Sequence, residues 1–186
     1  MQVIRSTRLL GLPRVAAVLL LPCAFLLPLL TACASKPPVV TETGATWSGL
    51  GISLKLPAGT WDIGEADEGD TVTFTTPDRA RCIALLRTPA RANEPAWYAL
   101  RALFVDFPDK KLLRRWEAAL PGGAKLPCAE YEVTLDERRV VVRAGAVRRN
   151  EWNYALAEWV FSGAPAFDAV AASLALPAVK PTERKP

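Results

Sequence analysis

The side chains with the strongest capacity for covalent chemistry in this chain of 186 residues are four cysteines, since histidine is absent. Cys23 and Cys33 lie within and at the end of a long apolar run, whereas Cys82 and Cys128 lie in the remainder of the chain. The lack of histidine excludes Ser-His-Asp and Cys-His nucleophilic sites, His-containing zinc sites and histidine acid–base catalysis. Cys82 and Cys128 alone are also too few for a four-thiolate zinc site.

The apolar run belongs to a three-part targeting pattern. Arg5, Arg8 and Arg14 form a basic leader without acidic residues, and the segment 15–30 is almost entirely apolar. Small residues then precede Cys33. A spanning helix needs about 20 apolar residues, and this run is shorter and contains prolines. The layout predicts a signal peptide over residues 1–32.

The end of this segment carries a specific motif, Leu30-Thr31-Ala32-Cys33. It resembles the lipobox of bacterial lipoprotein precursors at all four positions. The resemblance implies transfer of diacylglyceryl to the Cys33 sulfur, cleavage before Cys33 and acylation of the new amine, with chains such as palmitate. Two or three acyl chains make release from a membrane negligible. An ordinary cleaved signal peptide with an incidental cysteine, or an uncleaved membrane helix, is the alternative.

The residue after the cysteine bears on the location of the protein. In the lipoprotein family an Asp there marks retention at the inner membrane, and this chain has Ala34. The resemblance therefore implies a periplasm-facing protein anchored in the outer membrane, in a cell with two membranes.

Removal of the leader changes the charge of the chain. The whole chain has 23 basic and 19 acidic residues, a net charge of +4. Three of the basic residues lie within 1–32, so the rest of the chain carries 20 basic and 19 acidic residues, or +1. A nucleic-acid partner is therefore not expected.

The remaining chain is long enough for one domain with a buried core. Residues 33–46 are small, polar and proline-containing after the cysteine, and predict a lipidated Cys33 followed by a flexible tether. Residues 47–177 contain all six tryptophans and predict a single domain. Residues 178–186 predict a disordered tail.

With Cys23 removed and Cys33 lipidated, Cys82 and Cys128 remain in an exported domain. This arithmetic predicts one disulfide between them. The alternative is two separate buried thiols. Their spacing is unlike that of a CxxC motif, so a redox-active pair is not expected.

Hydrophobic periodicity predicts strands followed by helices and then strands again. Asn93 and Pro95 predict the start of a helix with apolar residues through Phe107, and a second helix is expected over 109–120. A terminal helix is expected after Gly163 and Pro165. The expected strands are 47–56, 61–63, 70–76, 81–88, 130–135, 138–147 and 152–161, with turns at 136–137 and 149–151.

Two stretches resemble PsbP-like domains. LKLPAGTW at 54–61 is similar to their opening strand, turn and tryptophan, and NYALAEWVFSGAPAFDAVAASLAL at 153–176 is similar to their last strand, turn and helix. Together with the order of elements, this predicts an α+β fold, an antiparallel sheet flanked by helices. The resemblance implies an accessory or binding scaffold and transfers no catalytic residue.

Other candidate sites have simpler explanations. The acidic run 65–70 could ligate Ca²⁺ through its carboxylates, but it lacks EF-hand spacing and a solvated turn explains it better, so no metal is expected. Glu130 and Glu132 share a strand face, which suits solvent exposure better than a hydrolytic carboxylate pair. Ser53 and Lys55 have the side chains of a Ser–Lys nucleophilic pair, but they lie on an expected exposed strand. No glycine-rich phosphate loop or cofactor motif occurs.

A basic cluster lies on or beside the expected hairpin and comprises Arg138, Arg139, Arg143, Arg148 and Arg149. Guanidinium groups bind phosphate and carboxylate bidentately, so this cluster is a candidate patch for phospholipid or an acidic protein partner. The alternative is a solvated face paired with acidic residues on neighbouring strands.

These observations predict a non-enzymatic, lipid-anchored scaffold that binds another component of the bacterial envelope. A carrier of a lipid or small molecule for an envelope transporter is the alternative, and a carboxylate-based hydrolase is the third. The expected partners are the membrane, through Cys33, and an envelope protein.

Overall fold

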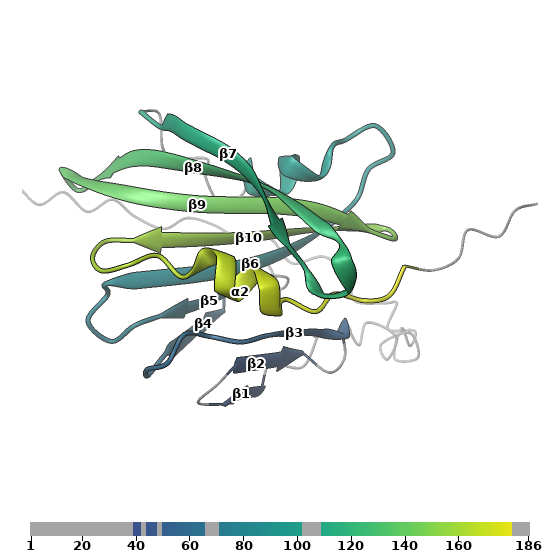
Figure 1. Ribbon diagram of the computed structural model, residues 1–186, viewed down its shortest axis with the longest axis horizontal. Helices are drawn as coiled ribbons and strands as arrows, with labels where there is room; N and C mark the ends of the chain where they lie inside the picture. Colours follow the sequence, from purple (N-terminus) through teal and green to yellow (C-terminus); the bar gives the residue numbers. More distant parts are fainter. Residues whose placement is uncertain (1–38, 42–43, 48–49, 66–70, 102–108, 180–186) are drawn as a thin grey trace, which may run out of the picture. The chain divides into compact units, whose positions relative to one another are not determined.

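An antiparallel sheet dominates the computed structural model, which describes residues 39–41, 44–47, 50–65, 71–101 and 109–179 (Figure 1). Seven strands pair in the order β4-β5-β6-β10-β9-β8-β7. Each neighbouring pair except β6 and β10 is consecutive in the chain, so the sheet is two meanders joined at its centre. The strands are β4 (Asp62–Glu65), β5 (Thr71–Thr75), β6 (Arg81–Pro89), β7 (Lys111–Ala119), β8 (Lys125–Leu135), β9 (Arg138–Arg149) and β10 (Trp152–Val160).

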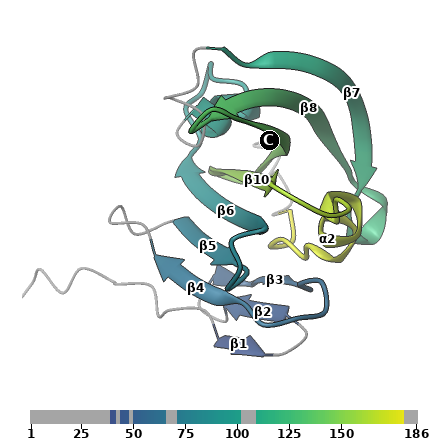
Figure 2. The same ribbon diagram turned by 90° about the vertical axis from the view of Figure 1, so that its left-hand side faces the viewer.

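A smaller sheet and one helix lie on the concave side of this large sheet (Figure 2). The smaller sheet has three antiparallel strands, β1 (Val39–Thr41), β2 (Gly44–Trp47) and β3 (Ile52–Leu54). The helix is α2 (Phe167–Ser173). Two short 3-10 turns, η2 (Ala96–Leu100) and η3 (Pro121–Gly123), precede β7 and β8.

Tight turns set the register of the long strands. Asp136 and Glu137 join β8 to β9 with φ of 47° and 64°, and Asn150 begins the next turn with φ of 52°. Two-residue hairpin loops favour positive φ because that backbone twist matches the twist of the strands. The turn predicted at 136–137 is confirmed, and the one predicted at 149–151 is found at 150–151.

Alternation along the strands gives the large sheet two different faces. The α2 face carries large apolar side chains that form one core with α2 and the smaller sheet; its buried members include Val72, Phe74, Ile83, Leu85, Leu126, Leu156 and Phe167. The η2 face carries a row of small side chains, which are Ala84, Ala129, Ala144, Ala146, Ala155 and Ala157. Larger buried side chains flank this row; they are Leu86, Val133, Val140 and Val142.

The predicted α+β class is wrong, because the segment expected as a helix over 109–120 is strand β7. Trp116 and Leu120 are four residues apart, a spacing that suits both a helix and a strand. Ala118 lies between them and is also buried, which is the two-residue period of a strand. Leu112 and Leu113, expected inside a helix, are each 43% exposed.

Over its described part, the helix expected from Asn93 is a 3-10 turn as far as Leu100, and of these residues only Arg101 is α-helical. The chain there makes the 3-10 turn η2, whose N-cap is Pro95 rather than Asn93, and residues 102–108 lie outside the described residues. Of the flanking helices, only the terminal one is confirmed, as α2. The fold of the described residues is therefore mainly β.

The folded region also begins earlier than predicted. Strand β1 and all of β2 except Trp47 lie within the segment 33–46 that was expected as a lipidated cysteine and flexible tether. Ala45 and Trp47 are buried in the α2-face core, which explains why this segment is ordered against β3. Among the described residues there is no helix with the length and apolar character needed to cross a membrane.

Candidate functional site

The five arginines of the predicted patch do not lie on one surface. They are spread along the whole of β9, from Arg138 after one turn to Arg149 before the next, a separation of roughly 36 Å for an extended strand. Alternation places Arg139, Arg143 and Arg149 on the α2 face, and Arg138 and Arg148 on the η2 face. The patch is thus two sets of arginines with different surroundings.

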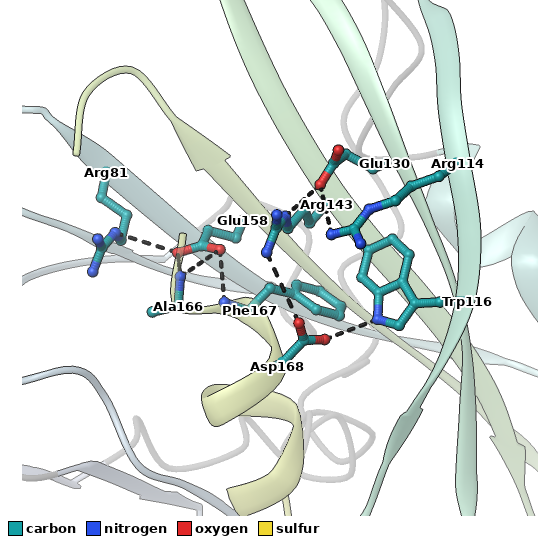
Figure 3. Close-up of polar contacts among 9 residues, drawn as sticks. All are labelled: Arg81, Arg114, Trp116, Glu130, Arg143, Glu158, Ala166, Phe167 and Asp168. Atoms are coloured by element: carbon teal, nitrogen blue, oxygen red, sulfur yellow. Dashed lines mark hydrogen bonds and ion pairs between the residues drawn. The ribbon is translucent and has the colours of Figure 1, made fainter. Parts of the chain in front are cut away.

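Arg143 belongs to a charge network beside α2 (Figure 3). Its Nε lies 2.6 Å from Glu130 Oε2, and its Nη1 lies 3.9 Å from Asp168 Oδ2. Arg114 bonds the same Glu130 oxygen at 3.1 Å, and the Trp116 indole donates to Asp168 at 2.8 Å. Two arginines thus face two carboxylates, so the network is electrically neutral and fastens α2 to β7, β8 and β9.

Arg148 holds a loop on the other face. Its Nη2 donates to the carbonyl oxygens of Arg91, at 2.8 Å, and Glu94. Its Nε donates to Asn153 Oδ1 at 3.2 Å, and Asn153 is 1% exposed. These bonds satisfy the backbone of the segment that leads into η2, so Arg148 has a structural role.

Glu158 is the buried carboxylate at the start of α2, and it is 1% exposed. It accepts hydrogen bonds from the backbone N–H groups of Ala166 and Phe167 at 2.8–3.1 Å, and Arg81 Nε lies 3.3 Å away (Figure 3). Burial raises the pKa of Glu158, although the Ala166 N–H group and Arg81 act in the opposite direction. A strand residue thus caps a helix whose own N-cap residue, Ala166, offers no side-chain bond.

The predicted disulfide between Cys82 and Cys128 is wrong, because both thiols are free. Cys82 is in β6 and Cys128 is in β8, three strand spacings apart, which corresponds to about 14 Å. Their side chains also lie on opposite faces of the sheet. A disulfide requires Cα atoms within about 7 Å and converging side chains.

Both thiols are poor nucleophiles. Burial raises the pKa of Cys128 to about 11 and raises that of Cys82. Cys128 packs in the α2-face core and donates to the carbonyl of Leu126 at 3.0 Å. A thiol reacts as its thiolate, so neither thiol is activated. The alternative of two separate buried thiols holds for Cys128, whereas Cys82 is partly buried.

Several other predicted features cannot be placed. The signal peptide, the lipobox Leu30-Thr31-Ala32 and Cys33 lie outside the described residues, as do residues 66–70 of the acidic run and residues 180–186 of the expected tail. Within the described ranges no group of three or more acidic or cysteine side chains is arranged to hold a metal ion.

Two hollows lie on the η2 face, one on each side of η2. Ala129, Ala144, Ala157 and Ala84 are direct neighbours across β8, β9, β10 and β6. Methyl side chains in a row leave room above the sheet, and a cavity of about 490 Å³ lies between η2 and the β7–β8 end of this row. Its walls include the aromatic and apolar side chains Trp97, Leu100 and Tyr131, and the cations Arg101, Lys110 and Arg115.

A second hollow of about 340 Å³ lies on the other side of η2, against β6 and β10. Glu94, Arg91 and Arg101 line it together with the buried Asn153. Sequence reasoning identified neither hollow. The available signal was the alternating small residues in A-G-A at 144–146 and A-L-A at 155–157, which place alanines on one strand face.

Comparison with known proteins identifies the fold. The sequence matches no protein-family model and no curated protein. Its structure is similar to that of cyanobacterial PsbP (CyanoP) from Synechocystis sp. PCC 6803, with a TM-score of 0.54 over 74% of this chain and 95% of that chain. The fold is PsbP-like. At 12% sequence identity, this similarity concerns the fold alone.

Two further structures are similar at lower scores to this PsbP-like domain. One is a protein from Bacteroides thetaiotaomicron, with a TM-score of 0.46 and 16% identity over 69% of this chain and 46% of that one. The other is a protein of unknown function from Pseudomonas aeruginosa, described as a putative regulator, with a TM-score of 0.36 and 18% identity over 58% of this chain and 76% of that one.

Proposed function

We propose that this chain is a non-enzymatic accessory protein of the bacterial envelope, anchored through acyl chains on Cys33, whose PsbP-like domain binds another envelope component. The observation that carries the proposal is the motif Leu30-Thr31-Ala32-Cys33 after a basic, then apolar, leader. The PsbP-like fold supports it, because the resemblance of this chain to PsbP-like domains implies an accessory or binding scaffold.

The early start of the folded region limits how far the domain can lie from a membrane anchor at Cys33. Only residues 34–38 separate Cys33 from β1, and five extended residues span at most about 17 Å. A domain anchored at Cys33 would therefore work close to the membrane surface. Its binding partner would be a membrane protein or a component bound at that surface.

Metabolic labelling of a bacterium that expresses the full chain tests the anchor. An alkyne-tagged fatty acid should label the wild-type protein and not Cys33→Ser, while the matched variant Cys128→Ser should keep the label. Labelling of Cys33→Ser, or no labelling of the wild type, would refute the anchor.

Membrane fractionation tests the location. The wild-type protein should sediment with the outer membrane, and Ala34→Asp should move it to the inner membrane. The same distribution for both proteins would contradict outer-membrane targeting. Crosslinking in solubilised outer membranes should then recover one reproducible envelope protein with the wild type, and recovery of none would contradict the scaffold role.

A carrier of small molecules is the second candidate function, because the 490 Å³ hollow on the η2 face falls in the size range of ligand pockets. The hydrolase has no such support among the described residues. The Glu130 oxygen that it would need already accepts bonds from Arg114 and Arg143.

A further inference from the structure

The larger hollow on the η2 face joins an apolar wall to a basic rim. Trp97 is 52% exposed and stacks on Tyr98, with ring centroids 4.4 Å apart. Leu100 and Tyr131 pack against the buried valines and alanines of the same face. These side chains present apolar surface to a space of about 490 Å³, which is enough for a small ligand.

The rim carries three cations from two segments. Arg101 directly follows η2, Lys110 directly precedes β7, and Arg115 lies in β7. No ion pair of these three is found within the part of the chain that the structure describes. The Arg101 guanidinium lies 4.2 Å from the Tyr98 ring centroid and 5.6 Å from that of Trp97. The aromatic rings therefore orient this cation without neutralising its charge.

On the α2 face, by contrast, arginine side chains are paired with carboxylates. Arg143 and Arg114 both bond Glu130, and Arg143 also faces Asp168. Among the described residues, charge is thus balanced where the sheet carries α2, whereas the three cations at the hollow have no ion-pair partner. An anion is the group that would complete the rim of the hollow.

We propose that this hollow binds a small anionic amphiphile, a molecule with one acidic head group on an apolar body, as in a medium-chain fatty acid. The head group would accept bonds from Arg101 and Arg115, which suit a carboxylate geometrically. The apolar body would lie against Trp97, Leu100 and Tyr131. This inference rests on the carrier role proposed above as the second function, and names its ligand class.

Photolabelling tests the site directly. The full chain, purified from membranes in a nonionic detergent, is irradiated with octanoic acid that bears a diazirine, and labelled residues are mapped by mass spectrometry. Labels should concentrate on the hollow and fall on Trp97, Leu100 or Tyr131. Unlabelled octanoate should compete for these positions, whereas octanol and sulfate should compete much less.

Paired variants test the contribution of charge. Arg101→Gln with Arg115→Gln should weaken competition by octanoate about tenfold, because two charge-assisted contacts are lost. The matched pair Arg138→Gln with Arg139→Gln removes the same charge at the exposed β8–β9 turn, and should leave competition unchanged.

The outcomes separate the two levels of the proposal. Labelling in the hollow with equal competition by octanol and octanoate would overturn the anionic ligand class and leave a carrier role standing. Labelling spread over the chain without concentration in the hollow would overturn both. Equal weakening by the two arginine pairs would attribute binding to net charge and would also overturn the proposed site.

Discussion

The two faces of the large sheet are built from side chains of different size. On the α2 face, residues such as Phe74, Ile83 and Leu156 meet Phe167 of α2 in a continuous buried core. On the η2 face, a row of alanines lies beneath a 3-10 turn of five residues, and hollows remain at both of its sides. Large side chains let a cover pack without voids, whereas methyl groups under a short cover leave space.

The faces also differ in how charge is handled. Arg143 and Glu158 on the α2 face are each held by opposite charges or backbone N–H groups. Arg101, Lys110 and Arg115 around the larger hollow have no such ion pairs in the described ranges. The carrier proposal gives the α2 face a structural role and makes the larger hollow of the η2 face the binding site, and each variant below can break that division.

Truncation of Phe167 should have the largest effect on stability. Phe167 is 1% exposed and meets the Trp116 ring edge-to-face at 5.8 Å. Phe167→Ala should lower the free energy of unfolding by about 3–5 kcal/mol, because it leaves a cavity in the core. Trp97→Ala on the other face should cost less than about 1 kcal/mol in the same denaturant titration. Equal losses would contradict the division between the faces.

Removal of the Glu158 carboxylate should have the next largest effect. Glu158→Ala should cost about 2–3 kcal/mol, because the buried N–H of Phe167 and that of Ala166 lose their acceptor. Glu158→Gln keeps an amide oxygen at this place and should cost less than about 1 kcal/mol. Denaturant titrations of both variants near pH 5 check this, and an equal cost would refute the capping role.

The pH dependence of the Glu158→Gln comparison has a definite sign. Burial raises the folded-state pKa of Glu158 above its ordinary 4.5, so the folded protein binds this proton more tightly than the unfolded chain. That stabilisation is present below pH 4.5 and is lost as the pH rises through the folded-state pKa. The unfolding free energy of the wild type minus that of Glu158→Gln should therefore decrease as the pH rises from 4.5. An increase would contradict the direction of the shift.

Enlarging one residue on each face should show which face has free space. A Cβ on Gly145 would lie 2.8 Å from Cys128 Sγ and from Leu126 Cγ, so Gly145→Ala should cost about 1–3 kcal/mol by overpacking. Ala129 borders the larger hollow, and Ala129→Leu should cost less than about 1 kcal/mol although it adds more atoms. Thermal unfolding compares them, and a larger loss for Ala129→Leu would show that the hollow has no room.

A reductant should have the smallest effect. Cys82 and Cys128 lie on opposite faces and are free, so the unfolding free energy should be the same with and without dithiothreitol. A disulfide between them would add about 2–5 kcal/mol under oxidising conditions. A decrease of that size on reduction would contradict the placement of the two thiols.

The sequence predicts correctly those elements whose apolar spacing fits only one kind of secondary structure. Val72 and Phe74 alternate with threonines, and β5 is found there. Trp116 and Leu120 fit both a helix and a strand, and long-range pairing with β8 decides for the strand. Local periodicity carries no information about that partner.

The functional features depend on which face a residue takes, and this limited their prediction. Arg143 and Arg148 are close in sequence, but the alternation of β9 sends them to opposite faces. Cys82 and Cys128 have a spacing that permits a loop, yet three strand positions separate them. The alanines of the η2 face become informative only once the register places them in a row.

The most direct test of the division between the faces is photolabelling of Ala129→Leu with the diazirine analogue of octanoic acid. The added side chain should project into the hollow and obstruct the ligand, so labelling of Trp97, Leu100 and Tyr131 should fall while the near-ultraviolet circular dichroism stays that of the wild type. Wild-type labelling of these residues in the folded Ala129→Leu protein would contradict the assignment of the η2 face as the binding face.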